Sequence, residues 1–363
     1  MKKNLQISTS EFICMLIGYS IIITELKFPD IINTYAAQNG WITTALSGIY
    51  PILFFTMYGF VFKAYPDKNI FQINLELLGK ILGTFFNIFF IIYLVAYSAT
   101  HFSGFAMILV NTILWYYTTY QTLIIVIIVA SIATFFRFKA QLKLGQFTLY
   151  VIIAICILLG FSLTKGNKLN IMPILSIAPK ELFKAVYHGI YAYAGFEIMV
   201  LYLPYLKNKS DYKKIAITTT SVLILILTWL IFIAIFYFGP DALNLFYFPM
   251  LDIMASIKVP LINSFTLIFI LCWSIHSLKN STFSFSNILN ILPPKKNTNY
   301  KKLWLVILIP FFYFISKLIS NVINLVYFVN YIFIPMMILV LFNIFLLFIS
   351  VIRRNKNDME NPS

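Results

Sequence analysis

The feature that most limits how this chain can fold is a succession of apolar segments, each long enough to cross a lipid bilayer. A transmembrane helix needs about 20 apolar residues, and such stretches follow one another along nearly all of the 363 residues. Only helices and closed barrels satisfy every backbone polar group inside a membrane. The pattern predicts ten helical spans, at residues 9–28, 41–62, 81–102, 119–136, 144–163, 182–203, 215–238, 260–282, 303–320 and 326–350.

The composition indicates an all-α integral membrane protein. Hydrophobic residues make up 61% of the chain and charged residues 11%, whereas a soluble domain carries about 25% charged residues. The net charge of +15 comes from short clusters of Lys and Arg between the apolar segments, which is typical of cytoplasmic loops. Because there is no basic domain, we expect no nucleic-acid partner.

The positions of Lys and Arg predict the orientation of the chain. With ten spans, the loops on the N-terminal side of the membrane carry most of these residues, so both termini are predicted to be cytoplasmic. An odd number of spans in each half makes the second half enter the membrane from the opposite side. We therefore expect one transmembrane domain with a 5+5 inverted repeat: residues 1–163, residues 164–352 and a cytoplasmic tail at 353–363.

Two connecting segments fit this inverted repeat. The segment at 65–80 places Ile70, Ile73 and Leu77 on one helical face, and the segment at 248–258 likewise begins with an aromatic residue followed by proline. Both are typical of short amphipathic helices at a membrane surface. Equivalent connections in the two halves should lie on opposite sides of the membrane.

One acidic residue, Glu197, falls within the predicted sixth span. Insertion scales assign an acidic residue at mid-membrane a cost of roughly 2.5–3.5 kcal/mol, so such residues usually face a bundle interior or a polar cavity. Gly195 lies just before Glu197 and Pro204 closes the segment, which predicts a broken helix at a ligand site. Three roles for Glu197 stay open: a clamp on the broken helix, a contact with a ligand or ion, and a proton relay.

The residues around Gly195 predict the chemistry of that site. Tyr191, Tyr193 and Phe196 would form an aromatic wall with few polar groups, as in many small-molecule sites. Ala194 adds little side-chain bulk to the same stretch. A freed helix N-terminus inside the membrane would favour an anionic group of the ligand.

The sequence contains no catalytic or metal-binding pattern. His101, His188 and His276 lie on three separate predicted spans without metal-ligand spacing, and we expect each to form hydrogen bonds in the interior. A Ser-His-Asp order, a Walker loop and a zinc motif are missing from the sequence. We therefore expect no enzyme, no metal and no cofactor.

Several motifs, in order along the chain, resemble those of one known family. Leu169–Ile174 reads Leu-Asn-Ile-Met-Pro-Ile, Tyr193–Glu197 reads Tyr-Ala-Gly-Phe-Glu, and Leu203–Tyr205 reads Leu-Pro-Tyr. These motifs resemble the B-type (GerB) subunits of bacterial spore germinant receptors, and the connecting segments at 65–80 and 248–258 are similar to that family as well. The family falls within the amino acid/polyamine/organocation transporter superfamily.

The resemblance implies a LeuT-like architecture in which spans one and six are broken beside a site at mid-membrane, with spans three and eight lining it. Glu197 and His276 then become candidates for a structural, ion-binding or proton-handling role. The family usually has a Gly-x-Gly-like break in span one, whereas this chain has Ile21–Leu26 there, which predicts a shifted or shallow break. The candidate ligand-binding residues are Ile21, Ile22, Thr24, Tyr97, Tyr191, Tyr193, Ala194, Gly195, Phe196, Trp273 and Ser274.

The resemblance also implies a function and partners. It implies a subunit in the inner membrane of the spore that binds a small nutrient, with an amino acid as the expected ligand. Its partners would be a multi-span A-type subunit and a lipoprotein C-type subunit, and a ligand-dependent change in helix arrangement would carry the signal. The alternative is an amino acid transporter coupled to H⁺ or Na⁺, since a receptor and a transporter can share one fold.

Overall fold

The computed structural model describes residues 6–21, 24–257, 265–292 and 298–360, and the regular structure within these ranges is helical. The α-helices are α1 (Thr9–Ser20), α2 (Thr24–Ala36), α3 (Gly40–Ser47), α4 (Ile49–Ala64), α5 (Ile70–Leu77), α6 (Gly79–Thr112), α7 (Thr119–Ala133), α8 (Phe138–Leu159), α9 (Pro179–Gly189), α10 (Met199–Tyr202), α11 (Tyr212–Phe238), α12 (Pro240–Leu243), α13 (Pro249–Ser256), α14 (Thr266–Ile291), α15 (Thr298–Leu318), α16 (Val322–Phe328) and α17 (Ile334–Glu360). Short 3₁₀ turns lie at η1 (Ala37–Asn39), η2 (Gly160–Lys165), η3 (Lys168–Ile171), η4 (Ile190–Tyr193), η5 (Phe196–Ile198), η6 (Leu203–Tyr205) and η7 (Lys209–Asp211), and a π-helical turn, η8 (Val329–Phe333), joins α16 to α17.

The apolar segments of the sequence are helical wherever they are described, although several are interrupted. The predicted first span is divided between α1 and α2, the second between α3 and α4, and the sixth among α9, η4, η5 and α10. The predicted span at 81–102 continues as α6 to Thr112. The first part of the predicted span at 260–282 lies outside the described residues, and α14 begins at Thr266. Hydrophobic periodicity predicted the presence of the helices more accurately than the residues at which they begin and end.

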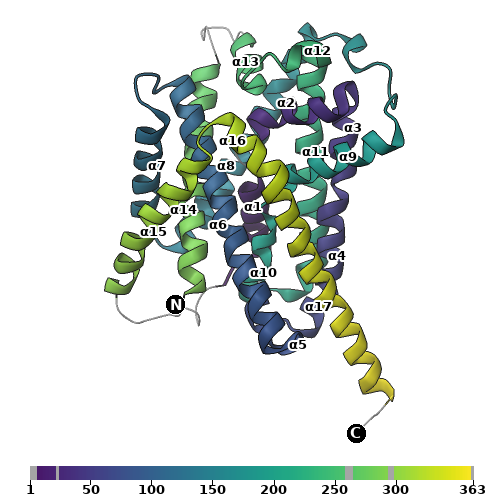
Figure 1. Cartoon of the computed structure of the whole chain (residues 1–363), viewed down its shortest axis with the longest axis vertical. Coiled ribbons are helices and arrows are strands. Elements are labelled where there is room, and N and C mark those ends of the chain that lie inside the picture. Colours follow the sequence, from purple (N-terminus) through teal and green to yellow (C-terminus); the bar gives the residue numbers. More distant parts are fainter. Residues whose placement is uncertain (1–5, 22–23, 258–264, 293–297, 361–363) are drawn as a thin grey trace.

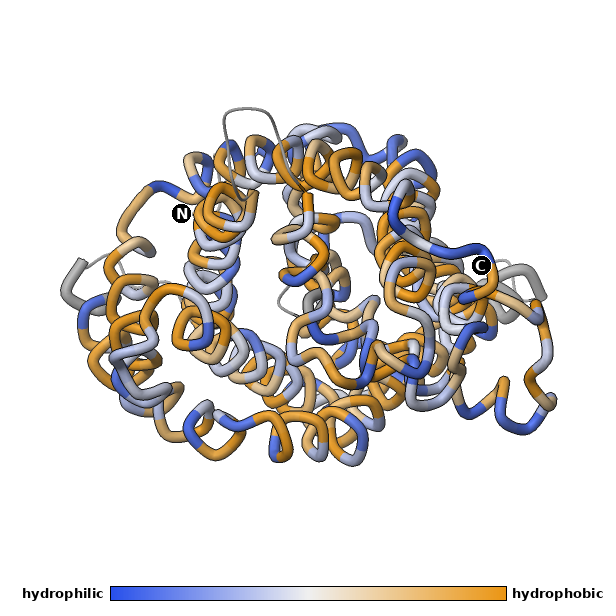
Figure 2. The backbone as a smooth tube through the Cα atoms, turned by 90° about the horizontal axis from the view of Figure 1, so that it is seen from above, coloured by the Kyte–Doolittle hydropathy of each residue, from blue (hydrophilic) through white to orange (hydrophobic). Residues whose placement is uncertain are grey.

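The described part of the chain has the length and composition of a helical integral membrane protein. Exposed apolar side chains such as Ile157 and Leu225, at 68% and 70% exposure, cover its sides. Figure 2 shows apolar residues around the periphery of the bundle, a surface suited to contact with lipid rather than water. Within the described ranges, five helical stretches are long and apolar enough to cross a bilayer: Lys27–Ala64, Gly79–Thr112, Phe138–Lys165, Lys209–Phe238 and Val322–Arg354.

Helix α1 lies in the interior of the bundle, where α8, α11 and α14 pack against it (Figure 1). Its sequence is largely apolar on all sides, and from Glu11 to Ser20 every residue except Ile13 is buried, as expected for a helix without a polar face. The second half of α14 is also interior, because all residues from Lys279 to Ile288 are buried. That half is rich in Ser, Thr and Asn, so it brings polar groups into the region beside α1.

The two short amphipathic helices predicted from the connecting segments are both present. Helix α5 is closed at its start by a capping box between Asn69 and Gln72, and it buries Ile70 and Ile73. Helix α13 begins with Pro249, whose missing N–H would have no partner in the first turn. Figure 1 shows α5 at one end of the molecule and α13 at the other.

Candidate functional site

The first break separates α1 from α2. Helix α1 ends at Ser20, Ile21 is extended with φ −77° and ψ 98°, and α2 begins at Thr24. Ile22 and the side chain of Thr24 lie outside what the structure describes. The run from Ile21 to Thr24 consists of β-branched residues, which lose side-chain freedom in a helix. The helix is therefore interrupted here without the small residues that the resembled family usually has.

The second break lies at Ala194 and Gly195. Helix α9 tightens into η4, Ala194 is extended with φ −60° and ψ 150°, and Gly195 has φ +110° before η5 resumes the helical path. Residues with a side chain rarely adopt such a positive φ, whereas glycine does so at little cost. Gly195 is thus the residue that permits this break.

The two breaks contact each other in the buried interior. A Cβ atom added at Gly195 would lie 3.0 Å from the backbone oxygen of Tyr19, on α1, and 2.9 Å from Cζ of Tyr97, on α6. The Tyr97 hydroxyl donates a hydrogen bond to the Tyr19 carbonyl oxygen, and the two rings lie 4.9 Å apart between centroids. The structure therefore brings Tyr97 and Gly195, from the predicted ligand set, together beside the end of α1.

Glu197 connects the second break to α4. Its side chain is fully buried; Oε1 accepts a hydrogen bond of 2.7 Å from the Tyr50 hydroxyl, and Oε2 accepts one of 2.6 Å from the backbone N–H of Gly195. Both carboxylate oxygens therefore have donors from the protein itself. In this arrangement the side chain spans the break and joins it to the neighbouring helix.

Tyr193 and Phe196 are directed toward α3 and α4. The Tyr193 hydroxyl donates a hydrogen bond of 2.8 Å to the carbonyl oxygen of Thr44. The Phe196 ring stacks on Phe55 at 5.2 Å between centroids and meets Phe54 edge-on at 5.1 Å. Ala194 is buried beside them. The aromatic wall predicted from the sequence thus packs against protein here, and its contact with a ligand stays a prediction.

Tyr191 lines a small cavity next to the first break, which we call the Tyr191 cavity. Lys27 and Ile31 of α2, Thr100 of α6 and Val329 of η8 contribute to its wall. Its volume is about 20 Å³. A cavity needs about 10–15 Å³ to hold one water molecule, so this one admits a single water.

Trp273 and Ile21 line a second cavity. This cavity has a volume of about 50 Å³, and apolar side chains from α8, α11, α13 and α14 form most of its wall. The Trp273 ring also meets Phe105 edge-on at 5.5 Å. Ser274 follows Trp273 on α14, and its buried hydroxyl oxygen has no hydrogen-bond partner among the described residues.

The three histidines form hydrogen bonds within the protein. His101 Nε2 lies 2.9 Å from the Ser277 carbonyl oxygen, and His188 Nδ1 lies 3.0 Å from Asn330 Oδ1. His276 Nε2–H donates to the carbonyl oxygen of Ile21 at 2.7 Å. Across the described ranges, His, Cys, Asp and Glu form no cluster of three that could hold a metal ion.

Sequence reasoning missed three residues that contact the breaks: Tyr50, Lys279 and Asn280. Tyr50 reaches Glu197, Lys279 Nζ donates to the Gly18 carbonyl oxygen at 2.9 Å, and Asn280 donates to Ile21 at 3.2 Å. The spacing of His276, Lys279 and Asn280 places all three on one helical face. The sequence shows that spacing, but it does not show that this face contacts the end of α1.

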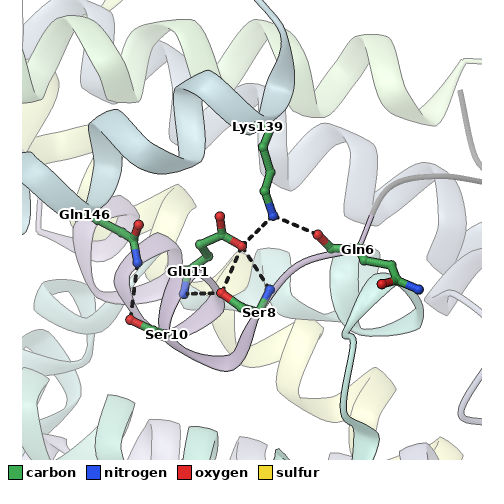
Figure 3. Close-up of polar contacts among 6 residues, drawn as sticks. All are labelled: Gln6, Ser8, Ser10, Glu11, Lys139 and Gln146. Atoms are coloured by element: carbon green, nitrogen blue, oxygen red, sulfur yellow. Dashed lines mark hydrogen bonds and ion pairs between the residues drawn. The ribbon is translucent and has the colours of Figure 1, made fainter.

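The start of α1 is held against α8 by the polar cluster in Figure 3. Lys139 Nζ donates to Glu11 Oε2 at 2.7 Å and to the Gln6 carbonyl oxygen at 2.9 Å. Glu11 in turn accepts from the backbone N–H of Ser8 at 2.9 Å, which completes a capping box. The end of α1 opposite the break is therefore fixed to the protein by charge-assisted hydrogen bonds.

Lys139→Met should lower the thermal unfolding midpoint of the purified chain. Glu11 is only 8% exposed, so the substitution removes a donor from a largely buried carboxylate at a cost of about 1–2 kcal/mol. Lys143→Met is the control, because Lys143 lies exposed on the same helix. Equal midpoints for the two variants would show that the cluster in Figure 3 does not hold α1.

The fold and these contacts define a helical integral membrane protein in which two interrupted helices meet in the interior. The chain belongs to the spore germination protein family, whose sequence model matches residues 6–294. It is 21% identical over 283 residues to spore germination protein GerQB of Bacillus cereus, with 77% of each chain covered. The predicted family is thereby confirmed, and with it a membrane protein of spore germination.

Proposed function

We propose that this chain is the nutrient-sensing B subunit of a spore germinant receptor and that a small nutrient binds at mid-membrane between the two breaks. The observation that carries the proposal is the contact of the breaks, where Tyr97 bonds the end of α1 and Gly195 lies against both. Irregular backbone at membrane depth is tolerated only where it is enclosed by protein or lines a cavity. A ligand at this point would act on α1, α6 and the sixth span together.

The proposed architecture is a ten-span, LeuT-like 5+5 inverted repeat. The interrupted helices support it, because α1 with α2 and α9 with α10 stand at the beginning of the two halves. The positions of α5 and α13 at opposite ends of the molecule support it as well (Figure 1). In transporters of this kind the discontinuous helices of the two repeats form the substrate site.

We place both termini on the cytoplasmic side of the inner spore membrane. Polar contacts connect the start of α1, the loop after α10, the loop before α5 and the last turns of α17 at one end of the bundle. That end is rich in Lys and Arg, as cytoplasmic loops are. The contacts are Thr9 with Asp211, Lys209 with Asp67, and Arg354 with Tyr65 and Glu76.

An amino acid is the nutrient that the Tyr191 cavity favours. Lys27 lines this cavity and forms a 2.7 Å ion pair with Asp30. The Lys27 ammonium at the cavity wall would attract the carboxylate of an amino acid. Of the ligand set proposed from the sequence, Tyr191 lines this cavity, and Tyr97 and Gly195 lie where the two breaks contact each other.

Ligand binding requires the helices around the Tyr191 cavity to move apart. At about 20 Å³ the cavity is too small for an amino acid. A nutrient that binds only a more open arrangement would shift the population toward it. We propose that the A-type and C-type subunits respond to that shift, through the surfaces that α2 and α16 present next to the cavity.

Thr100→Met should abolish the stabilisation of the purified chain by its nutrient. The longer side chain would fill the Tyr191 cavity, and a ligand that binds only the folded state raises its stability by about 2.7 kcal/mol at a hundredfold excess over Kd. The measurement is the thermal midpoint against a panel of amino acids, sugars and nucleosides. Thr112→Met is the control, because Thr112 lies on α6 and makes the same kind of bond to its own helix.

An unchanged ligand response in Thr100→Met would place the site elsewhere. If no compound in the panel stabilises the unmodified chain, the result contradicts the proposed nutrient-sensing role. Uptake of a labelled amino acid by proteoliposomes that contain only this chain would instead identify a transporter.

A further inference from the structure

The cavity lined by Trp273 and Ile21, which we call the Trp273 cavity, has no part in the proposed nutrient site. Its volume is about 50 Å³, several times the roughly 10–15 Å³ that one water molecule needs. Every side chain in its wall is aliphatic, aromatic or sulfur-containing. A buried water needs about two to four polar partners, and cavities with apolar walls stay dry and bind apolar molecules. The cavity is therefore suited to an apolar occupant.

The Trp273 cavity borders the lipid-facing surface where α8 and α14 pack together. On α8 the wall includes Val151 and Ile155, which are half-buried, whereas Ile153 and Ile157 on the same helix are exposed. On α14 the half-buried Cys272 contributes to the wall. The rim of the cavity is thus continuous with apolar side chains that face the acyl chains of the bilayer.

The far wall of the Trp273 cavity lies in the interior of the bundle. Met254 of α13 and Leu230 of α11 line it, and they are 0% and 8% exposed. Ile21 lines it as well and is the residue at which α1 ends. The Ile21 carbonyl oxygen accepts hydrogen bonds from His276 and Asn280. The cavity therefore extends from the lipid-facing rim to the first break.

We propose that the Trp273 cavity binds the end of an acyl chain of a membrane lipid, which enters between α8 and α14 and contacts the end of α1. Lipid tails are as apolar as leucine, so the gain on binding comes from the van der Waals contacts that an empty cavity lacks. A free amino acid is a poor occupant, because this wall would leave its carboxylate and ammonium without partners. Lipid is the apolar molecule that surrounds the rim.

The test is photolabelling of the full chain, without nutrient, in nanodiscs of phosphatidylcholine in which some acyl chains end in a diazirine. Light releases N₂ from the diazirine, and the carbene that remains inserts into a neighbouring bond of the protein. Mass spectrometry of the peptides then locates the label. Labels should appear on Met254 and Leu230 as well as on exposed residues such as Ile153, because the cavity leads the chain end to the buried wall.

Cys156→Met should lower the labelling of Met254 and Leu230 about tenfold. Cys156 lines the cavity and is 8% exposed, so the longer side chain would occupy the space of the chain end, and overpacking opposes their joint presence. Ile157→Met is the matched control, because Ile157 is the next residue of α8 and is exposed. It should leave the labelling unchanged.

Labels confined to exposed residues of the unmodified chain would overturn the proposal, and this measurement needs no variant. Labelling of Met254 and Leu230 that persists in Cys156→Met would overturn it too, because the chain end would then arrive by another route. These outcomes are separate from the nutrient site: the Trp273 and Tyr191 cavities share no lining residue within the described ranges, so the chain can fail this test and still bind a germinant.

Discussion

Gly195→Ala should destabilise the purified chain by roughly 2–6 kcal/mol and abolish the nutrient response of spores that carry it. The backbone at Gly195 has φ +110°, and residues other than glycine are held in such regions at a cost of about 1–3 kcal/mol. The added methyl group would also lie 3.0 Å from the Tyr19 carbonyl oxygen and still closer to the Tyr97 hydroxyl, and overpacking of this kind costs about 1–3 kcal/mol. Thermal unfolding and a germination assay at matched protein levels measure the two effects.

Substitutions at two other glycines distinguish the cost of backbone strain from the cost of steric conflict. Gly79 has φ +75° with no atom within 4 Å of an added Cβ, whereas Gly160 has an ordinary φ and its nearest atom would lie 3.6 Å away. Gly79→Ala should therefore show the strain alone, and Gly160→Ala should be close to neutral. A Gly195→Ala variant no worse than Gly79→Ala would mean that the two breaks are not in contact as described.

Tyr97→Phe should partly compensate for Gly195→Ala. The substitution removes the hydroxyl group nearest the added methyl, although it also leaves the Tyr19 carbonyl oxygen without that donor. Residues in contact show non-additive effects, so the double variant should be more stable than the sum of the single effects predicts. Strict additivity would contradict the contact between Tyr97 and Gly195.

Glu197→Ala should have an effect of similar size for a different reason. The substitution leaves two donors inside the protein, the Tyr50 hydroxyl and the Gly195 N–H, and a buried unsatisfied group costs about 1–3 kcal/mol. We therefore expect a loss of about 2–6 kcal/mol, measured by thermal unfolding. Glu181→Ala is the control, because Glu181 is an exposed carboxylate at the start of α9, in the same broken segment.

Glu197→Gln and Tyr50→Phe distinguish the three roles that the sequence left open for Glu197. A clamp needs two acceptor oxygens, one for the Tyr50 hydroxyl and one for the Gly195 N–H. Because a Gln side chain has a single acceptor oxygen, Glu197→Gln should lose part of the stability. Tyr50→Phe should lose less, and its effect should largely vanish in the Glu197→Ala background. If Glu197→Gln keeps full stability but loses the nutrient response, Glu197 is a ligand or proton contact and not a clamp.

Much of the organisation of this protein could be predicted from local sequence patterns. The apolar segments predicted the helices, and the amphipathic patterns after Tyr65 and Phe248 predicted α5 and α13. Gly195 beside Glu197 predicted the interruption of the sixth span, because a glycine and a buried charge are local departures from an apolar helix. The motifs around these residues predicted the family, which the comparison with known sequences confirmed.

The break in the first span was harder to predict from the sequence. The expected small residues are missing, yet α1 ends at Ser20. A run of β-branched residues weakens a helix only slightly, so the run alone does not decide whether the helix continues. The side chains on α6 and α14 that donate hydrogen bonds to the freed carbonyl oxygens decide it.

The sequence by itself determined the helices, the position of Gly195 and the family, because each depends on residues close together in the chain. The tertiary structure decided which groups satisfy the breaks. Tyr97 and Tyr19 are separated by 78 residues, Tyr50 and Glu197 by 147, and Lys279 and Gly18 by 261. Side-chain periodicity shows which face of a helix is polar, but a single sequence does not show which face it meets. The pairing of distant helices therefore set the hydrogen-bond partners of Glu197 and Lys279.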